Sequence, residues 1–346
     1  MSIKNFEFCG KHLGQGQPAF IVAEVGFNHN GDVELAKRMI ESAAKNGADA
    51  VKLQTFIAKE MISNSLMADD PDNPGNAIPF YEFFQRYELS RSDYEILFAY
   101  AKKINIPLFS TPFEEASLEM LVELGAPAIK IASPDLTYLP FLKKVAETGL
   151  PIVLSTGMGN EEEISQALKI LQPKCSIILL HCVSNYPSQH EEMNLHCMET
   201  LRSRFNVPVG LSDHTLDNLS PIVAASLGAV FIEKHFTVDR KLPGIDQSIS
   251  IEPQELKKLK IELVNVNQIL GNDKKQIQPS EISVKQSARR SLVARIDIAA
   301  GTPLTEEMIA CKRPGTGIPP TELNNVLGKS CKKDISAEQV LTWEMF

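Results

Sequence analysis

The sequence contains no apolar run long enough to cross a membrane. A transmembrane helix needs about 18 or more consecutive apolar residues, and no stretch of this chain reaches that length. The first residues, MSIKNFEFCGKHLGQG, also lack the apolar segment of a secretory signal peptide. These absences predict a cytoplasmic protein with no membrane partner.

The six cysteines lack the spacing of a disulfide framework or of a zinc ribbon. They are scattered from Cys9 to Cys331, and no two of them form a Cys-x-x-Cys pair. Disulfide-stapled domains and structural zinc sites both depend on closely spaced cysteines. We therefore expect reduced cysteines that serve mainly in packing.

The sequence also lacks a strong basic cluster. It has 35 Lys and Arg against 43 Asp and Glu, for a net charge of −8. A nucleic-acid-binding surface needs clustered positive side chains to neutralise phosphates. Only KQSARRS, residues 285–291, is locally basic, and a solvated segment between domains explains it more simply. We expect no nucleic-acid partner.

What the sequence does contain is a regular alternation of short apolar runs with longer segments of helical period. The apolar runs occupy residues 20–24, 49–54, 106–110, 127–132, 151–155, 176–181, 207–211 and 229–234. Segments such as VELAKRMIESAAKNG and NLSPIVAASLG carry apolar residues on one helical face and end in glycine, a common helix terminator. Eight such βα units predict an α/β fold, the (β/α)8 TIM barrel.

A chain of 346 residues has room for a second, smaller domain. We expect the barrel over residues 1–275, a linker over 276–286 and a β-rich domain over 287–346. The linker is predicted because GNDKKQIQPSE is polar and contains glycine and proline. The loop after the second strand, about residues 55–88, is unusually long and includes DDPDNPGNA. Such loops are lids or disordered segments, and this one would lie on the active face.

Polar side chains stand at the end of every predicted strand. They are Glu24, Lys52, Ser110, Thr111, Lys130, Ser133, Ser155, Thr156, His181, Ser184, Ser212, Asp213, His214, Glu233 and His235. Active sites of this barrel class lie at the C-terminal ends of the strands. A single buried polar residue can be a satisfied core group. A polar residue at all eight ends predicts an active site.

Two of these residues, Lys52 and Lys130, come from strands two apart in the barrel and can face one anion. Thr111, Ser133, Ser155, Ser184 and Ser212 supply hydroxyl donors around it. With the backbone amides of STGMGN, which opens the next helix, this set suits a small ligand that bears phosphate and carboxylate. Taken alone, STGMGN is a weak signal, because glycine after a strand is more often part of an ordinary βα turn.

His214 and His235 end the seventh and eighth strands, which are neighbours in a barrel. Each alone is more simply a core histidine, but together they can share a divalent ion and leave positions open for substrate. Glu233 projects to the same side as His235 if the segment is extended. Glu24, on the adjoining first strand, is a candidate acid or base. We expect Asp213 to orient His214.

A set of motifs along the chain carries a family resemblance. In order they are AEVGFNHNG, VKLQTF, FSTPF, KIASPD, LSTGM, HCVSNYP, GLSDHT and EKHFTVDRKLPGIDQSIS. They resemble the sialic acid synthase family, enzymes that condense phosphoenolpyruvate with an N-acetylated hexosamine to give a nonulosonic acid. The tail, with ARRSLVARIDIAAGTPLTEEMIACKRPGTGI, resembles the antifreeze-like (SAF, β-clip) domain that ends those enzymes. The resemblance covers essentially the whole chain.

The resemblance implies a role for each matching residue. A divalent metal, manganese or magnesium, would be bound by His214 and His235. Phosphoenolpyruvate would be held by Lys52, Thr111, Lys130, Ser133, Ser155, Ser184 and Ser212. The amino sugar would be contacted by Glu24, Asn76, Tyr186, Asp246 and Arg313. We expect Glu24, the two lysines and the two histidines to be catalytic, and Glu233 to join the substrate-binding set. The family arrangement is a domain-swapped homodimer, in which Arg313 reaches the partner's barrel.

The implied reaction is attack of the phosphoenolpyruvate methylene carbon on the aldehyde of the open-chain sugar, followed by water addition and loss of phosphate by carbon–oxygen cleavage. The first expectation for the sugar is N-acetylmannosamine, giving N-acetylneuraminate, because NPGNA resembles the bacterial enzymes. A diacetamido sugar, giving legionaminic or pseudaminic acid, is the alternative, and a 6-phosphorylated sugar is the third. Two departures from the family pattern, GIDQ at 244–247 in place of GPDH and Ser184 in place of asparagine, are expected near the sugar pocket.

Two other functions compete with this one. A metal-dependent barrel aldolase or epimerase would explain the histidine pair and Glu24, but not two lysines with five hydroxyl donors. A non-catalytic saccharide-binding or ice-binding protein would explain the tail. It would also predict an inert barrel face, against which the strand-end residues argue.

Overall fold

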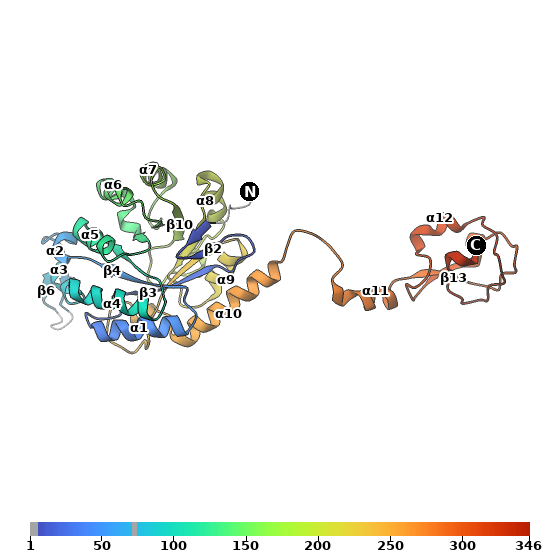
Figure 1. The fold of residues 1–346 in the computed structure, drawn as a ribbon, viewed down its shortest axis with the longest axis horizontal. Coiled ribbons are helices and arrows are strands. Elements are labelled where there is room, and N and C mark those ends of the chain that lie inside the picture. Colours follow the sequence, from blue (N-terminus) through green and yellow to red (C-terminus); the bar gives the residue numbers. More distant parts are fainter. Residues whose placement is uncertain (1–5, 71–74) are drawn as a thin grey trace. The chain divides into compact units, whose positions relative to one another are not determined.

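The structure, a computed structural model, describes residues 6–70 and 75–346. The chain divides into two compact units, Met1–Gly271 and Asn272–Phe346 (Figure 1). Residues 71–74, the PDNP of the long loop, lie outside the described residues. Across the described part of the chain, no helix is both long and apolar enough to cross a membrane. All six cysteines are free.

The first unit is a closed barrel of eight parallel strands, as the sequence predicts. The strands are β3 (Phe20–Gly26), β4 (Ala50–Thr55), β7 (Leu108–Pro112), β8 (Ile129–Ile131), β9 (Ile152–Ser155), β10 (Ile177–Cys182), β11 (Val209–Asp213) and β12 (Phe231–His235). Each overlaps one of the eight predicted runs, and β12 pairs with β3 to close the ring. Both closing strands therefore bring their C-terminal ends to the same rim.

Helices cover the outside of the barrel (Figure 1). They are α1 (Val33–Lys45), α4 (Arg91–Lys103), α5 (Glu115–Glu123), α6 (Leu139–Glu147), α7 (Glu161–Leu171), α8 (Cys197–Phe205), α9 (Leu219–Ser226) and α10 (Pro253–Leu270). Their starts follow ordinary capping chemistry. Asp32 caps α1, and Ser90 with Asp93 forms a capping box on α4.

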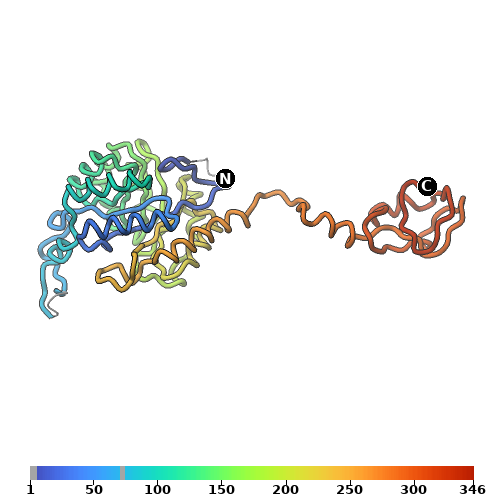
Figure 2. The backbone as a smooth tube through the Cα atoms, turned by 60° about the horizontal axis from the view of Figure 1, so that its bottom comes forward, coloured from blue at the N-terminus to red at the C-terminus, as the bar shows by residue number. Residues whose placement is uncertain are grey.

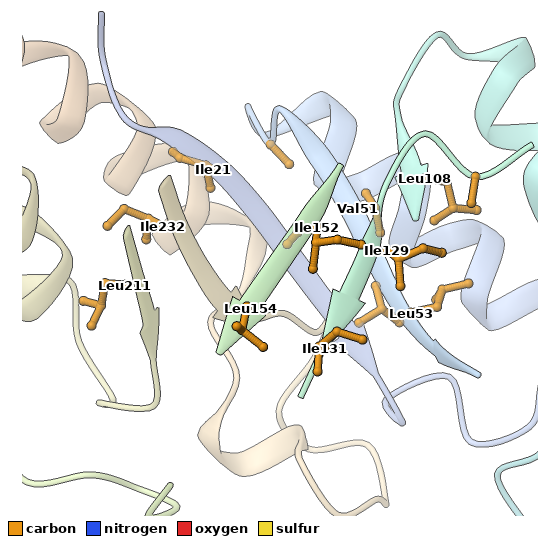
Figure 3. Close-up of a cluster of buried hydrophobic side chains, with 14 of the residues drawn as sticks. Ile21, Val51, Leu53, Leu108, Ile129, Ile131, Ile152, Leu154, Leu211 and Ile232 are labelled. Atoms are coloured by element: carbon orange, nitrogen blue, oxygen red, sulfur yellow. The ribbon is translucent and has the colours of Figure 1, made fainter. Parts of the chain in front are cut away.

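Side chains alternate along each strand, so every strand contributes to two apolar layers. One layer packs between the strands and the helices, and Figure 3 shows several of its members, among them Ile21, Val51, Leu108 and Ile232. The other layer fills the interior of the barrel. Its strand residues are Phe20, Val22, Ala50, Phe109, Ala128, Val153, Ile178, Leu180, Val230 and Phe231. The next inward-facing residue of each strand lies beyond this interior layer, toward the C-terminal end of the barrel.

A short N-terminal hairpin, β1 (Phe6–Phe8) and β2 (Lys11–Leu13), adds to the interior layer at the start of the strands. The ring of Phe8 lies 5.4 Å from that of Phe20 and 5.6 Å from that of Phe231. The sequence did not predict this hairpin. It closes the N-terminal end of the barrel and leaves the C-terminal end for the site.

The long segment after β4 has secondary structure of its own. It contains α2 (Ala58–Met61), β5 (Met67–Asp69), β6 (Ala77–Pro79) and α3 (Phe80–Gln85), and β5 pairs with β6. Figure 2 shows it in light blue, projecting from the barrel. Rings of the segment contact one another and the barrel loops; Phe84 lies 5.2 Å from Phe27 and 6.0 Å from Phe56.

The second unit has its own apolar core, which includes Leu292, Ile298 and Leu341. Its regular elements are α11 (Ile282–Ala288), β13 (Ser291–Ala294), β14 (Ile309–Lys312) and α12 (Leu323–Val326), and β13 pairs with β14. Most of the remaining residues are turns and isolated bridges. The unit is small and turn-rich, as the sequence predicts.

Candidate active site at the C-terminal ends of the barrel strands

A polar cavity opens above the interior layer of the barrel. It is lined by Glu24, Lys52, Gln54, Thr111, Lys130, Ala132, Ser133, Pro134, Ser155, Cys182, Tyr186, Ser212, His214, Glu233 and His235. Every strand of the barrel supplies at least one of these residues or carries one directly after its end. The sequence-predicted strand-end set is therefore gathered mostly in one place.

The two-residue period of a strand explains why these side chains converge. In β12, Phe231 belongs to the interior apolar layer, and Glu233 and His235 follow at two and four positions further on. In β4, Lys52 and Gln54 follow the interior residue Ala50 in the same way. Side chains at such positions share one face of the strand.

Two lysines and two glutamates form a buried charge network on the cavity floor. Lys52 Nζ lies 2.5 Å from Glu24 Oε2 and 4.0 Å from Glu233 Oε2. Lys130 Nζ lies 3.4 Å from Glu233 Oε1. Lys52 also donates to Thr111 Oγ1 at 3.0 Å. The four charges balance one another, which makes their burial tolerable.

The two glutamates differ in their affinity for a proton. Burial raises the pKa of the Glu24 carboxyl, and Lys52 offsets only part of this. Burial also disfavours the charged form of Glu233, but Lys130 and Lys52 outweigh it and hold its pKa below the usual range. Burial lowers the pKa of Lys130. Glu24 is therefore the better placed of the two carboxyls to accept and return a proton.

Hydroxyl groups lie around the lysines. Ser155 Oγ is buried and has no hydrogen-bond partner among the described residues, whereas Ser212 Oγ donates to Glu233 Oε1 at 3.0 Å. Ser133 Oγ accepts from the Gly157 amide at 3.0 Å. A buried hydroxyl without a partner is costly unless a ligand uses it. Ser155 is thus a ready donor for a bound anion.

The glycine segment STGMGN contributes less than the sequence suggests. Gly157 does face the site, because a Cβ there would overlap Ser184 Oγ and lie 2.8 Å from Ser133 Oγ. The amides at the start of α7, however, are already used: Asn160 Oδ1 accepts from Glu162 and Glu163. Three glutamates in the first turn also oppose an anion there.

The two histidines lie side by side at the rim of the cavity. Their ring centroids are 5.5 Å apart, and the ring of Tyr186 lies 4.1 Å from His214 and 6.0 Å from His235. His214 Nδ1 lies 2.7 Å from the carbonyl oxygen of Val183, which can only accept. In the neutral ring the hydrogen is therefore assigned to Nδ1, and Nε2 keeps a lone pair.

The donor set of this pair fits a divalent metal. His235 Nδ1 is buried with no hydrogen-bond partner, and burial lowers the pKa of His235 well below its usual value, so the ring is neutral as a ligand must be. No group of three or more His, Cys, Asp or Glu side chains suited to a metal occurs in residues 6–70 and 75–346. Two imidazoles leave the remaining positions to water and substrate, as in catalytic sites.

Asp213 makes no direct hydrogen bond to the ring of His214. The group that orients His214 is the carbonyl of Val183. Asp213 Oδ2 accepts from Lys234 Nζ at 2.5 Å instead. His181, another strand-end residue, also lies outside the cavity, and its Nε2 lies 2.6 Å from the carbonyl oxygen of Met193. Both side chains lie on the face of their strand that is turned toward the surrounding helices.

The residues expected near the sugar fall in three places. Asp246 approaches the cavity, with Oδ2 3.5 Å from His235 Nδ1, and burial raises its pKa to about 6. Asn76 is exposed beside the β5–β6 hairpin and does not line the cavity. Arg313 is exposed at the end of β14 in the second unit. Ser184 lies beside the cavity, 4.0 Å from Cys182 Sγ.

Gln247, one of the two departures from the family pattern, does not line the cavity. This side chain is buried; its Nε2 donates to the Asn28 carbonyl at 2.8 Å, and its Oε1 accepts from Thr237 Oγ1 at 2.5 Å. Ser250 Oγ donates to the backbone carbonyl of Asp246 at 2.6 Å. The side-chain amide of Gln247 is therefore used to hold the loop that carries Asp246, and the expectation that GIDQ lies near the sugar pocket stays a prediction.

Sequence reasoning missed Gln54 and Cys182. Gln54 Nε2 donates to Glu24 Oε1 at 3.1 Å and so fixes the carboxylate next to Lys52. Cys182 Sγ lies 3.5 Å from Ser133 Oγ and 4.0 Å from His214 Nδ1. The two-residue period would have found both, since Gln54 follows Lys52 by two positions and Cys182 follows Leu180 of the interior layer.

Comparison with known families identifies this arrangement. Residues 39–275 match the model of the NeuB family, and residues 289–346 match the SAF domain. The chain belongs to the NeuB family. This NeuB-family chain is 38% identical over 342 residues to N,N'-diacetyllegionaminic acid synthase of Legionella pneumophila, covering 96% of each chain. It is 40% identical to the enzyme of that name from Campylobacter jejuni, over 93% of this chain and 98% of that one.

Solved structures agree with this assignment. The crystal structure of N-acetylneuraminic acid (sialic acid) synthetase from Leptospira borgpetersenii, in complex with citrate, has a TM-score of 0.75 and 37% identity. The match covers 82% of this chain and 95% of that one. The NeuB-family chain is therefore an enzyme of the nonulosonic acid synthase family, with a TIM barrel followed by a SAF domain.

Proposed function

We propose that this enzyme condenses phosphoenolpyruvate with an N-acetylated amino sugar to give a nonulosonic acid and phosphate. The observation that carries the proposal is one cavity that combines two buried lysines, an unpartnered serine hydroxyl and a histidine pair. A metal-dependent aldolase or epimerase explains the histidine pair but does not account for two lysines together with the hydroxyl groups. A non-catalytic binding protein has no need of the balanced buried charges.

Phosphoenolpyruvate is a small trianion, and the floor of the cavity suits it. Lys52 and Lys130 supply positive charge in a region shielded from water, where each ion pair is stronger than in solution. Thr111, Ser155 and Ser212 supply hydroxyl donors on the same floor. On binding, the lysines would exchange part of their contact with the glutamates for contact with the substrate.

Two sugars are candidates for the second substrate. N-acetylmannosamine is the expectation from the sequence. The relatives named as N,N'-diacetyllegionaminic acid synthases, at 38% and 40% identity, favour a 2,4-diacetamido sugar over the 6-phosphorylated sugar, whose mouse synthase is 33% identical. We place the diacetamido sugar first. Gln54 and Tyr186 line the cavity and Asp246 approaches it, and these polar groups can meet its hydroxyl and amide groups.

In this mechanism the methylene carbon of phosphoenolpyruvate forms a bond to the aldehyde carbon of the sugar. The aldehyde oxygen takes up a proton to become a hydroxyl, and the net source of that proton is the water consumed in the next step. Water adds to the carbon that bears the phosphate, and the carbon–oxygen bond to phosphate then breaks to leave a ketone. Glu24 is placed to take the proton from water, because its pKa is raised by burial. Lys52 and Lys130 hold the phosphate as charge develops on it.

A divalent metal, manganese or magnesium, would be held by His214 and His235 and would act as a Lewis acid on the aldehyde. Val183 fixes one imidazole, and Tyr186 covers the pair on one side. These residues keep both rings in place before any ligand arrives.

The test is a phosphate-release assay with purified protein, phosphoenolpyruvate and a manganese salt. Each candidate sugar is added in turn: N-acetylmannosamine, its 6-phosphate and the 2,4-diacetamido sugars of the legionaminic and pseudaminic pathways. We expect release with one sugar at a kcat/KM at least about tenfold above the others. No release with any sugar, with and without metal, would contradict the proposal.

The geometry at Gly157 yields a prediction about phosphoenolpyruvate. Gly157→Ala places a methyl group against Ser184 Oγ and Ser133 Oγ. We expect kcat/KM for phosphoenolpyruvate to fall by about a hundredfold, the usual result of displacing a preorganised donor. Manganese binding should not change, because the histidines are not contacted. An unchanged kcat/KM for phosphoenolpyruvate would show that this turn is not part of its site.

The oligomeric part of the proposal is a domain-swapped homodimer in which Arg313 completes the partner's sugar site. It is supported by the exposure of Arg313 directly before a loop, residues 314–317, that Ser291 holds at both ends. Ser291 Oγ donates to the Pro314 carbonyl at 2.7 Å and accepts from the Gly317 amide at 2.9 Å. An arginine presented in this way is suited to recognise an acyl oxygen.

Co-expressing two variants, one impaired in the tail and one inactive in the barrel, tests the swap. Arg313→Ala is expected to raise KM for the sugar about tenfold or more, and KM for phosphoenolpyruvate far less. His235→Ala is expected to be inactive. If the tail serves the partner, a hybrid dimer of the two has one intact site, so co-expression should restore activity. If each tail serves its own barrel, no hybrid site is intact, and the mixture stays as low as its components.

A further inference from the structure

Behind the histidine pair lies a second buried ion pair that the reaction does not use. Asp213 and Lys234 have side chains that are 0% and 1% exposed, and Lys234 Nζ lies 2.5 Å from Asp213 Oδ2. Neither residue lines the cavity. Both side chains lie on the strand face that is turned toward the helices, and their neighbours in the chain point into the barrel.

The position of this pair relative to the histidines is specific. Asp213 directly precedes His214, and Lys234 directly precedes His235. The two residues are also direct partners in the register between β11 and β12. An ion pair at this rung fixes the two strands against sliding past each other at the point where both histidines project.

The pair also ties down the backbone on the far side of His214. Asp213 Oδ1 accepts from the amide and the hydroxyl of Thr215, at 3.1 and 3.0 Å. Lys234 Nζ donates to the carbonyl oxygen of Thr215 at 2.5 Å. The residues before and after His214 are therefore both bonded to a group that adjoins His235.

A buried ion pair of this kind seldom adds net stability, because removing two charges from water costs about as much as their attraction returns. Its best-attested use is to specify one register. We infer that Asp213, Lys234 and Thr215 are positioning residues that set the separation of His214 and His235 for a divalent metal. The inference deepens the proposed function and depends on its metal site.

The hydrogen-bond pattern explains why this arrangement acts on both rings together. A change of one residue in register would turn His235 to the helix side and Lys234 toward the cavity. Smaller displacements would alter the spacing of the two imidazoles, to which a metal with fixed bond lengths is sensitive. Lys234 and Asp213 oppose both movements from behind the site.

The test measures metal affinity directly, without turnover. The double variant Asp213→Asn with Lys234→Met removes both charges and leaves neither buried ion unpaired. We expect it to bind Mn2+ at least about tenfold more weakly in a calorimetric titration, the range seen for residues that support metal ligands. We also expect an altered visible spectrum of the Co2+ form. Its melting temperature should stay close to that of the natural protein, because the net worth of a buried pair is small.

Two further variants make the result decisive. Thr215→Val keeps the shape and the ion pair, and should weaken Mn2+ binding about threefold; it decides the matter if the double variant does not fold. Lys260→Met, which breaks the contact of Lys260 Nζ with Asp49 at 2.8 Å, should lower the melting temperature without changing Mn2+ affinity. Mn2+ affinity within twofold of the natural protein in both site variants would overturn the inference. Failure of the natural protein to bind Mn2+ would instead overturn the metal in the proposed function.

Discussion

Replacing either His214 or His235 by alanine is expected to lower kcat/KM by about a thousandfold or more while the barrel remains folded. A Lewis acid bound at these rings supplies several kcal/mol of stabilisation to developing charge. Among the described residues His235 Nδ1 makes no hydrogen bond and lies 3.5 Å from Asp246 Oδ2, so truncation of the ring breaks no hydrogen bond of that nitrogen. Steady-state kinetics with phosphoenolpyruvate and sugar, and a Mn2+ titration of each variant, measure the two effects.

His181→Ala is the matched control. His181 is also an imidazole at the end of a barrel strand, but it lies outside the cavity and contacts Met193 and Cys197. We expect this variant to melt at a lower temperature and to keep kcat/KM within about threefold. Manganese-dependent turnover retained in His214→Ala or His235→Ala would count against shared ligation. Equal losses in all three variants would point to a general effect of strand-end histidines on folding.

The fold was predictable because its signals are local. Each barrel strand is a short apolar run, and helices such as α1 carry an apolar face that the sequence displays. The N-terminal hairpin was missed because its two strands have three residues each and owe their place to contacts of Phe8 with Phe20 and Phe231. Such contacts join residues too distant in sequence for periodicity to reveal.

The site was predictable only as a set of candidates, because the ends of the strands offer inward and outward residues alike. His181 was on the candidate set and Cys182 was not, yet Cys182 lines the cavity. The two-residue period, counted from the apolar interior residue of each strand, separates the two. Gln54 follows from the same count. The sequence thus showed the alternation of side chains along each strand. The structure was needed to show which residues of the alternation face the barrel interior.

Other features could not be predicted from one strand at a time. The pairing of Asp213 with Lys234 depends on the register between two strands, which no local pattern gives. The burial of Gln247 depends on the course of a loop that brings its side-chain amide to the Asn28 carbonyl and the Thr237 hydroxyl. The placement of Asn76 likewise follows from the β5–β6 hairpin. These are consequences of tertiary structure.

Lys130→Met is expected to reduce kcat/KM for phosphoenolpyruvate by about a thousandfold. Lys130 is fully buried beside Glu233, with Nζ 3.4 Å from Oε1, so it is a preorganised charge in a region of low dielectric constant. Methionine has nearly the same length and volume, which keeps the packing of the floor. The loss should appear in both kcat and KM for phosphoenolpyruvate, and much less in KM for the sugar.

A structural explanation of that loss must be separated from a functional one. Lys130→Met leaves Glu233 with Lys52 at 4.0 Å as its remaining cation, and breaking a buried ion pair costs about 3–5 kcal/mol of stability. The double variant Lys130→Met with Glu233→Gln removes the unpaired charge and should recover most of that stability. If the lysine acts on the substrate, activity does not return with the fold. Recovery of kcat/KM together with the melting temperature would mean that Lys130 serves only to neutralise Glu233, and that the anion is held by Lys52 and the hydroxyl groups alone.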